Sequence, residues 1–246
     1  MTGLEVCANS FSSALAAQTG GAIRVELCEN MAEGGTTPSF GQIKLCKEKL
    51  SIKIWPIIRP RGGDFLYSAD EFDLMKEDVK ICKELGCSGI VTGVLLANGE
   101  IDKGRCKVLI DLAYPMPVAF HRAFDMSKDL PRALEDLIEL GFLRVLTSGG
   151  AESAYKGIET LEKLVKQANG RIEIMPGAGI NEHNILEIKD QTGAHTFHSS
   201  ARIKIKSKMK YKNPTSKMGS VEDEYQYDQT SATLVKHMVN LLNSNL

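Results

Sequence analysis

The strongest constraint on the fold is an alternation of strand-like and helix-like segments along the chain. Short apolar runs that are typical of strands begin near residues 4, 24, 52, 89, 117, 144, 171 and 195, and each precedes a stretch with helical spacing. Eight such units in 246 residues, 43% of them hydrophobic, favour a closed (β/α)8 barrel. An open doubly wound sheet usually has about six strands. We therefore predict a TIM barrel that forms one domain over residues 1–246.

Helix ends support this count, and one long segment interrupts it. The clearest helical patterns span residues 69–85, 130–140, 153–167 and 233–242. Glycines stand where helices should end, at Gly86, Gly141, Gly170 and Gly193. The segment 202–230 is lysine-rich at its start and acidic at its end. We predict that it is a long loop between the eighth strand and the last helix, which covers the barrel mouth or contacts another subunit. A barrel that serves as an interaction scaffold stays open as an alternative.

Composition excludes several classes of protein. Thirty basic residues stand against thirty-one acidic ones, and no basic stretch interleaves aromatic residues, so we expect no nucleic-acid partner. No apolar run is long enough for a membrane span, and three residues before the first strand leave no room for a signal peptide. Because this chain is far larger than disulfide-stapled domains, its six cysteines predict reduced thiols and a cytoplasmic location.

The carboxyl ends of the predicted strands are polar, and in a TIM barrel these ends carry function. Glycine-rich or charged stretches follow five strands: "IIRPRGGDF" (57–65), "AFHRAFD" (119–125), "RVLTSGG" (144–150), "IMPGAGI" (174–180) and "FHSSAR" (197–202). The turn with Gly177 and Gly179, followed by Ser199 and Arg202, occupies the usual phosphate site of this fold. It predicts a site for a small anion, unless these glycines only end the strands.

Acidic, basic and histidine side chains at the same ends favour an enzyme-like pocket. Glu5, Glu26 and His121 are suited to act as acid and base, since burial raises the pKa of a carboxylate and a nearby arginine lowers it. Three arginines add positive charge: Arg59, Arg61 and Arg122. These residues predict an enzyme of unassigned reaction that acts on a small anionic or phosphorylated metabolite. The alternative is a Glu–Arg network that only fills the polar layer of the barrel.

Two strands repeat a glutamate two residues before a cysteine. Strand alternation sends Glu5 and Cys7 to one face, and it does the same for Glu26 and Cys28. Adjacent parallel strands run about 4.8 Å apart, so two inward thiols on such strands can hold one metal ion linearly. Soft thiolates select Cu(I), whereas zinc requires four ligands. Alternatively, both cysteines are small apolar residues of the core.

The ordered motifs of the chain resemble those of the CutC family of copper homeostasis proteins. Besides four of the stretches above, they are "LEVCA", "RVELC", "EGGTTPS" (33–39), "NGEID" (98–102) and "MPGAGI". The resemblance covers nearly the whole chain. It implies a TIM barrel, a cytosolic protein linked to copper tolerance or trafficking, Cu(I) at Cys7 and Cys28, and a homodimer or homotetramer. One departure is Ala178, where the turn of this family usually has a third glycine.

Overall fold

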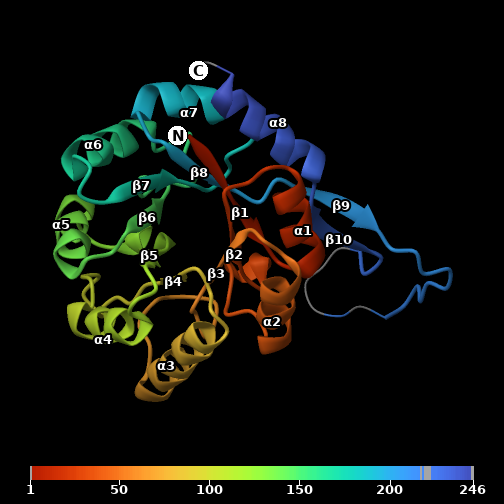
Figure 1. Cartoon of the computed structure of the whole chain (residues 1–246), viewed down its shortest axis with the longest axis horizontal. Helices are drawn as coiled ribbons and strands as arrows, with labels where there is room; N and C mark the ends of the chain where they lie inside the picture. The colour runs from red at the N-terminus through yellow and green to blue at the C-terminus, as the bar shows by residue number, and fades with distance from the viewer. Residues whose placement is uncertain (1, 217, 219–222, 245–246) are drawn as a thin grey trace.

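Parallel strands form an inner ring inside a ring of helices (Figure 1). The computed structural model of the chain describes residues 2–216, 218 and 223–244. The predicted (β/α)8 barrel is confirmed, because every strand-like run of the sequence forms a strand. Within the described residues, the barrel strands are β1 (Gly3–Ala8), β2 (Arg24–Leu27), β3 (Lys53–Pro56), β4 (Ile90–Thr92), β5 (Val118–Phe120), β6 (Arg144–Thr147), β7 (Glu173–Pro176) and β8 (Thr196–Ser199).

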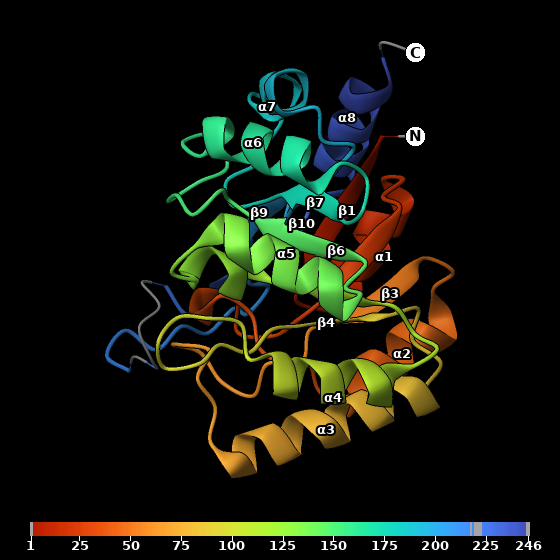
Figure 2. The ribbon, with the colours of Figure 1, turned by 90° about the vertical axis from the view of Figure 1, so that its left-hand side faces the viewer.

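Helices cover the outside of the strands, as α5 and α6 do beside β6 and β7 in the turned view (Figure 2). Ser68 and Glu71 form a capping box at the start of α3, which satisfies N–H groups of the first helical turn. The α-helices are α1 (Phe11–Thr19), α2 (Phe40–Lys49), α3 (Ala69–Glu84), α4 (Lys103–Ala113), α5 (Leu130–Leu140), α6 (Ile158–Ala168), α7 (Ile185–Thr192) and α8 (Ala232–Asn243). Two 3-10 helices follow strands, η1 (Met31–Glu33) and η2 (Arg122–Met126).

The helix predicted from residue 153 begins later, at Ile158. Gly157 lies against the loop after β6, where a Cβ atom on it would be 1.9 Å from the carbonyl oxygen of Ser148. The N–H of Ala154 donates to the carbonyl of Ala178 at 2.9 Å. The residues before α6 are therefore held by neighbouring loops, a tertiary effect that helical periodicity does not report.

The register of the strands sets the heights of the inward side chains. The hydrogen-bonded order is β3-β2-β1-β8 in one half and β4-β5-β6-β7 in the other. A bridge between Ile57 and Val91 joins β3 to β4, and β7 lies beside β8. Cys7 of β1 is opposite Glu26 of β2, and Glu5 is opposite His198 of β8. The side chains of these residues consequently stand in adjacent layers inside the barrel.

The two faces of the strands differ in character. Outward side chains such as Leu4, Val6 and Leu27 are completely buried under the helices and form the main apolar core. The interior holds a layer of buried charges around Glu5. The Glu5 carboxylate accepts a hydrogen bond from Arg24, lies 3.5 Å from Arg144, and lies 2.8 Å from the Nδ1 atom of His198. The Glu–Arg network considered from the sequence therefore exists, and it lies at the level of Glu5.

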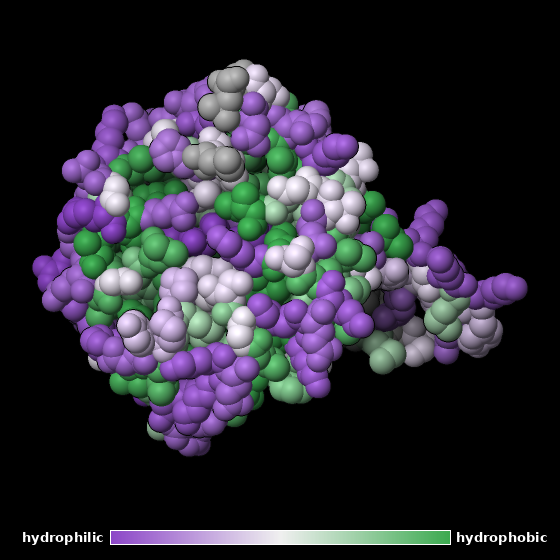
Figure 3. All heavy atoms as spheres, viewed as in Figure 1, coloured by the Kyte–Doolittle hydropathy of each residue, from purple (hydrophilic) through white to green (hydrophobic). Residues whose placement is uncertain are grey.

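Part of the predicted loop 202–230 forms an antiparallel ribbon that projects from the barrel (Figure 1). Its strands are β9 (Arg202–Lys206) and β10 (Gln226–Thr230). Lysine and isoleucine alternate in β9, as in a strand, and Lys204 pairs with Asp228 at 3.0 Å. Hydrophilic side chains cover much of this segment and of the helical rim (Figure 3). Of the predicted loop, residues 217 and 219–222 lie outside the described residues.

None of the helices in the described ranges has both the length and the apolar character needed to cross a membrane.

Backbone strain at Ala178 yields a prediction for stability. Ala178 has φ +77°, a left-handed conformation that costs an L-residue about 1 kcal/mol or more. We expect Ala178→Gly to raise the free energy of unfolding by roughly 1 kcal/mol, measured by urea denaturation. Ala133→Gly within α5 is the opposite control, since it should lower that free energy by about 1 kcal/mol or more. A destabilising Ala178→Gly would show that this turn is not strained.

The charged layer yields a second prediction. Burial raises the pKa of Glu5, but Arg24, His198 and Arg144 outweigh this effect and lower it from 4.5 to about 2. A lowered pKa stabilises the fold above the unfolded value and ceases to do so as the pH falls through the folded value. The shift corresponds to roughly 3 kcal/mol, fully present at neutral pH.

We expect Glu5→Gln to lower the free energy of unfolding at pH 7 by about 3 kcal/mol or more, because two buried arginines lose their carboxylate. Between pH 4.5 and pH 2, the variant should lose less stability than the wild type. Urea denaturation at several pH values tests both statements. Glu139→Gln removes an exposed carboxylate of α5; it is the control and should change the free energy of unfolding little. If the free energy of unfolding depends on pH in the same way for the wild type and Glu5→Gln, the lowered pKa of Glu5 is contradicted.

Candidate functional site

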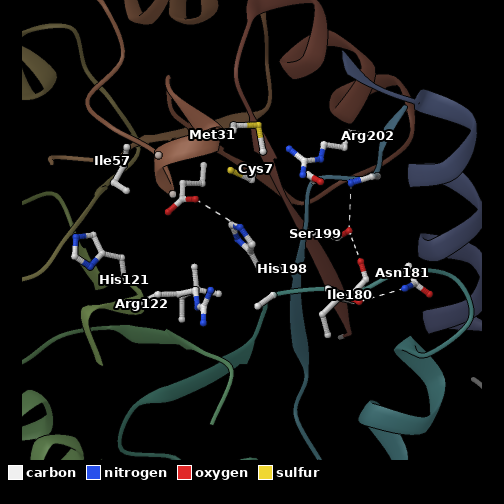
Figure 4. A pocket seen from close by; sticks show the side chains of 18 of the residues that line it. Cys7, Met31, Ile57, His121, Arg122, Ile180, Asn181, His198, Ser199 and Arg202 are labelled. Atoms are coloured by element: carbon white, nitrogen blue, oxygen red, sulfur yellow. Dashed lines mark hydrogen bonds and ion pairs between the residues drawn. The ribbon is translucent and has the colours of Figure 1, made fainter. Parts of the chain in front are cut away.

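A cavity of about 660 Å³ opens at the carboxyl ends of the strands. His121 and Arg122, which follow β5, line one wall, and Ser199 of β8 and Arg202 of β9 line the other (Figure 4). Cys7 lies between these walls, near His198. The cavity therefore occupies the place where TIM barrels carry their functional sites.

Cys7 and Cys28 meet at the bottom of this cavity. Cys7 belongs to β1, and Cys28 follows β2, where its N–H donates to the carbonyl of Ala8 at 3.0 Å. Their sulfur atoms are 3.3 Å apart, with one thiol donating to the other. Cys7 borders the cavity, whereas Cys28 is fully buried behind it. The hydrogen bond with Cys28 and burial raise the pKa of Cys7 well above its usual value, so the metal-free thiol keeps its proton.

Glu26 and His198 stand beside Cys7. One potential ligand atom from each of these three residues lies within 4.8 Å of the other two. The Nε2 atom of His198 is 3.6 Å from one carboxylate oxygen of Glu26, and the other oxygen has no hydrogen-bond partner in the described structure. Burial raises the pKa of Glu26, and the nearby His198 opposes that rise. This set of sulfur, nitrogen and oxygen atoms is able to hold a metal ion beside the thiol pair.

Glu5 does not line the cavity but supports it from below. Its carboxylate binds the Nδ1 atom of His198, which leaves Nε2 facing Glu26. Burial lowers the pKa of His198, but Glu26, Cys7 and Glu5 together raise it well above the usual value. An imidazolium therefore lies between two carboxylates, and it must lose a proton before Nε2 can bind a metal. A carboxylate in this position is the usual partner of a metal-binding histidine.

Two residues of the site were not among the sequence-based candidates. The alternation in "TFHS" places Phe197 outward and His198 inward, a signal that points to His198 once the strand register is known. Met31, in η1 directly after β2, packs against the buried cluster that contains Cys28. Its thioether lies near Cys7 (Figure 4) and is a soft donor. Neither position has a motif that identifies it without the fold.

The arginines after β3 have different surroundings. Arg59 is buried at the cavity wall and donates to three backbone carbonyls at 2.6 to 2.8 Å, those of Glu33, Gly35 and Gly63. Arg61 instead binds the carboxylates of Asp64 and Glu71 at 3.0 and 2.6 Å. It is not among the residues that line the cavity. Arg59 therefore contributes to the cavity, and Arg61 holds the loop that follows β3.

The structure brings together most of the predicted anion-binding turn. Three of its four residues line the cavity: Gly179, Ser199 and Arg202. Gly177 does not, because it packs against Leu146, which a Cβ atom on it would approach to 2.4 Å. The hydroxyl of Ser199 donates to the carbonyl of Ile180 at 2.7 Å. Arg202 is 3.4 Å from a carboxylate oxygen of Asp228. The polar groups of this turn thus mainly hold the loop and ribbon in place.

Sequence comparisons identify relatives over most of the chain. The sequence model of the CutC family matches residues 2–203. A CutC family protein from Chromobacterium violaceum is 50% identical over 234 residues, which are 95% of each chain. The human copper homeostasis protein cutC homolog is 46% identical over 235 residues, 95% of this chain and 86% of the human one.

A structural comparison agrees with the sequence relatives. The crystal structure of a CutC protein from Streptococcus agalactiae is similar with a TM-score of 0.78 and 36% identity. The match covers 81% of this chain and 99% of the streptococcal one. Phosphoribosyl anthranilate isomerase from Thermotoga maritima, with a TM-score of 0.60 and 12% identity, shares the fold alone. With its barrel, its ordered motifs and these relatives, the chain belongs to the CutC family of copper homeostasis proteins.

Proposed function

We propose that the protein binds Cu(I) through Cys7 and Cys28 and contributes to copper tolerance or trafficking in the cytoplasm. The observation that carries this proposal is the pair of reduced sulfur atoms 3.3 Å apart at the bottom of an open cavity. Thiolate sulfur is the ligand that Cu(I) prefers. The name of the human relative, which refers to copper homeostasis, also supports it.

The surroundings of the thiols favour Cu(I) over zinc. A structural zinc site needs four closely placed ligands, and the two sulfurs have no further cysteine beside them in the described part of the chain. An additional soft donor, the thioether of Met31, packs against the same buried cluster as Cys7. Glu26 and His198 form an ion pair in the metal-free protein, so their use as ligands would break an existing interaction. Two thiolates are sufficient for Cu(I), which accepts low coordination numbers.

Burial also gives the site a means of holding the ion. Cys28 is fully buried, and Cys7 is accessible only from the cavity side. An ion bound between them is shielded from bulk solvent by Trp55 and Ile57, which pack around Cys28. Entry and release would then proceed through the cavity mouth, past Met31.

Direct titration tests the ligand assignment. Under anaerobic reducing conditions, with a colorimetric Cu(I) chelator as competitor, the wild type should bind one equivalent of Cu(I) that the Cys7→Ser/Cys28→Ser variant does not bind. Cys46→Ala/Cys106→Ala removes two buried helical thiols and is the matched control, which should retain the equivalent. Unchanged tight binding by Cys7→Ser/Cys28→Ser would refute the proposal.

The pH dependence of binding is a second prediction. Cys7 keeps its proton in the metal-free protein, and the thiolate is the metal-binding form, so Cu(I) must displace at least one proton. The apparent affinity should therefore rise by about tenfold per pH unit for each proton displaced. Competition titrations between pH 6 and pH 8 measure this slope. A flat profile would mean that the bound ion does not displace a thiol proton.

A further inference from the structure

The cavity is much larger than a copper site requires. A metal ion between Cys7 and Cys28 would occupy only the floor, whereas the whole cavity measures about 660 Å³. Pockets for small organic ligands usually span roughly 300 to 1,000 Å³. The walls above the floor are therefore large enough for a second ligand, and their chemistry indicates its class.

Arg59 brings a buried positive charge to one wall. Its side chain is 4% exposed, and within the described residues no carboxylate lies at ion-pairing distance from it. Backbone carbonyls bind its terminal nitrogens, the ring of Phe65 lies 4.8 Å from its guanidinium carbon, and its Nε atom has no hydrogen-bond partner among the residues that the structure describes. Buried charges in proteins are usually paired. A missing counter-charge at a cavity wall is what an anionic ligand would supply.

His121 adds an unused donor on the same wall. Its ring centre is 5.0 Å from that of Phe65, with the two ring planes tilted by 48°, so Arg59, Phe65 and His121 form a row of contacts, called the Arg59–Phe65–His121 stack below. Burial and the charge of Arg59 lower the pKa of His121 to about 3, so the ring is neutral at physiological pH. Its Nδ1 atom accepts a hydrogen bond from the N–H of Ala123 at 3.2 Å, which places the proton on Nε2, and Nε2 has no hydrogen-bond partner within residues 2–216, 218 and 223–244.

The acidic side chains around the cavity do not neutralise Arg59, because in the described part of the chain none of them lies at ion-pairing distance from it. Glu26 faces His198 at 3.6 Å, and Glu182 faces His183 at 3.7 Å. Asp125 binds Arg122 at 2.8 Å, and it also accepts hydrogen bonds from the loop after β6. Arg122 itself is 44% exposed at the mouth, so part of its guanidinium faces the cavity opening.

Apolar side chains line other parts of the cavity. They are Ile57, Phe65, Leu146, Ile180, Leu234 and Met238. From these observations we infer that the cavity holds a small organic anion, a carboxylate or a phosphate ester, with its charged group beside Arg122 and the Arg59–Phe65–His121 stack and its apolar body against these apolar side chains. This site is separate from the thiol pair and does not depend on copper.

Binding of simple probes to the metal-free, reduced protein tests this inference. Phenyl phosphate and inorganic phosphate share a charged group, as do benzoate and acetate, but only the first of each pair has an apolar body. By isothermal titration calorimetry, phenyl phosphate or benzoate should bind saturably and at least about tenfold more tightly than its small counterpart. The tighter of these two probes identifies the preferred charged group. The inference would be overturned if neither phenyl phosphate nor benzoate binds saturably, or if neither binds more tightly than its counterpart without a ring.

Variants place the binding at the proposed wall. Arg59→Gln and Arg122→Gln should each weaken binding of the tighter probe by about tenfold, because each removes a positive charge beside the charged group of the ligand. Arg132→Gln removes the same charge from the exposed surface of α5 and should leave binding unchanged. If Arg59→Gln does not fold, Arg122→Gln decides the matter, since Arg122 is partly exposed. Binding that is insensitive to Arg122→Gln would overturn the inference.

The Cys7→Ser/Cys28→Ser variant separates this site from the copper proposal. It should bind phenyl phosphate or benzoate as the wild type does, even though it is expected to lose Cu(I). Anion binding that disappears with the two thiols would overturn the claim of a separate site.

Discussion

The buried carboxylate of Glu5 is the interaction on which the rest of the site depends. It joins four strands, because its partners Arg24, Arg144 and His198 come from β2, β6 and β8. In a low-dielectric interior such a cluster is stable only when every charge has a partner, so the geometry of each member is restricted by the others. The consequence for function is that Glu5 fixes the Nδ1 atom of His198 at the floor of the cavity, while the Nε2 atom faces Glu26.

This charged layer continues toward the amino ends of the strands, where Glu173 pairs with Arg144 and accepts a hydrogen bond from Thr196. Above it, the floor of the cavity carries two thiols, an imidazolium and a carboxylate, and the wall carries a stacked arginine and a neutral histidine. Arg59 is positioned by carbonyls of two loops, whereas Cys7 and Cys28 are positioned by the β1–β2 register. Loops and strands thus contribute separate functional elements at one barrel mouth.

The thiol pair could be found from the sequence because it depends on two local rules. Strand alternation puts each Glu-x-Cys on one face, and consecutive βα units put their strands side by side. His198 and Met31 lacked such a signal: the first became a neighbour of Cys7 only when β8 closed onto β1, and the second depends on the turn after β2. Arg59 and Arg61 are two residues apart, yet only Arg59 reaches the cavity, because local acids hold Arg61. Likewise, the sequence predicted an irregular loop over 202–230, but pairing of residues 20 to 28 positions apart produced β9 and β10.

The amino-acid sequence alone determined the barrel, the order and approximate bounds of its strands, and the membership of Cys7 and Cys28 in one inward face, since hydrophobic periodicity is a local property of the chain. Only the tertiary structure decided which charges are paired. Glu5 became the centre of an ion network, Ser199 became a donor to the loop after β7, and Arg59 has no acidic partner among the described residues. These outcomes depend on distances between strands that are far apart in the sequence. Burial and the neighbouring groups then set the protonation of Cys7, His121 and His198, and both exist only once the barrel has closed.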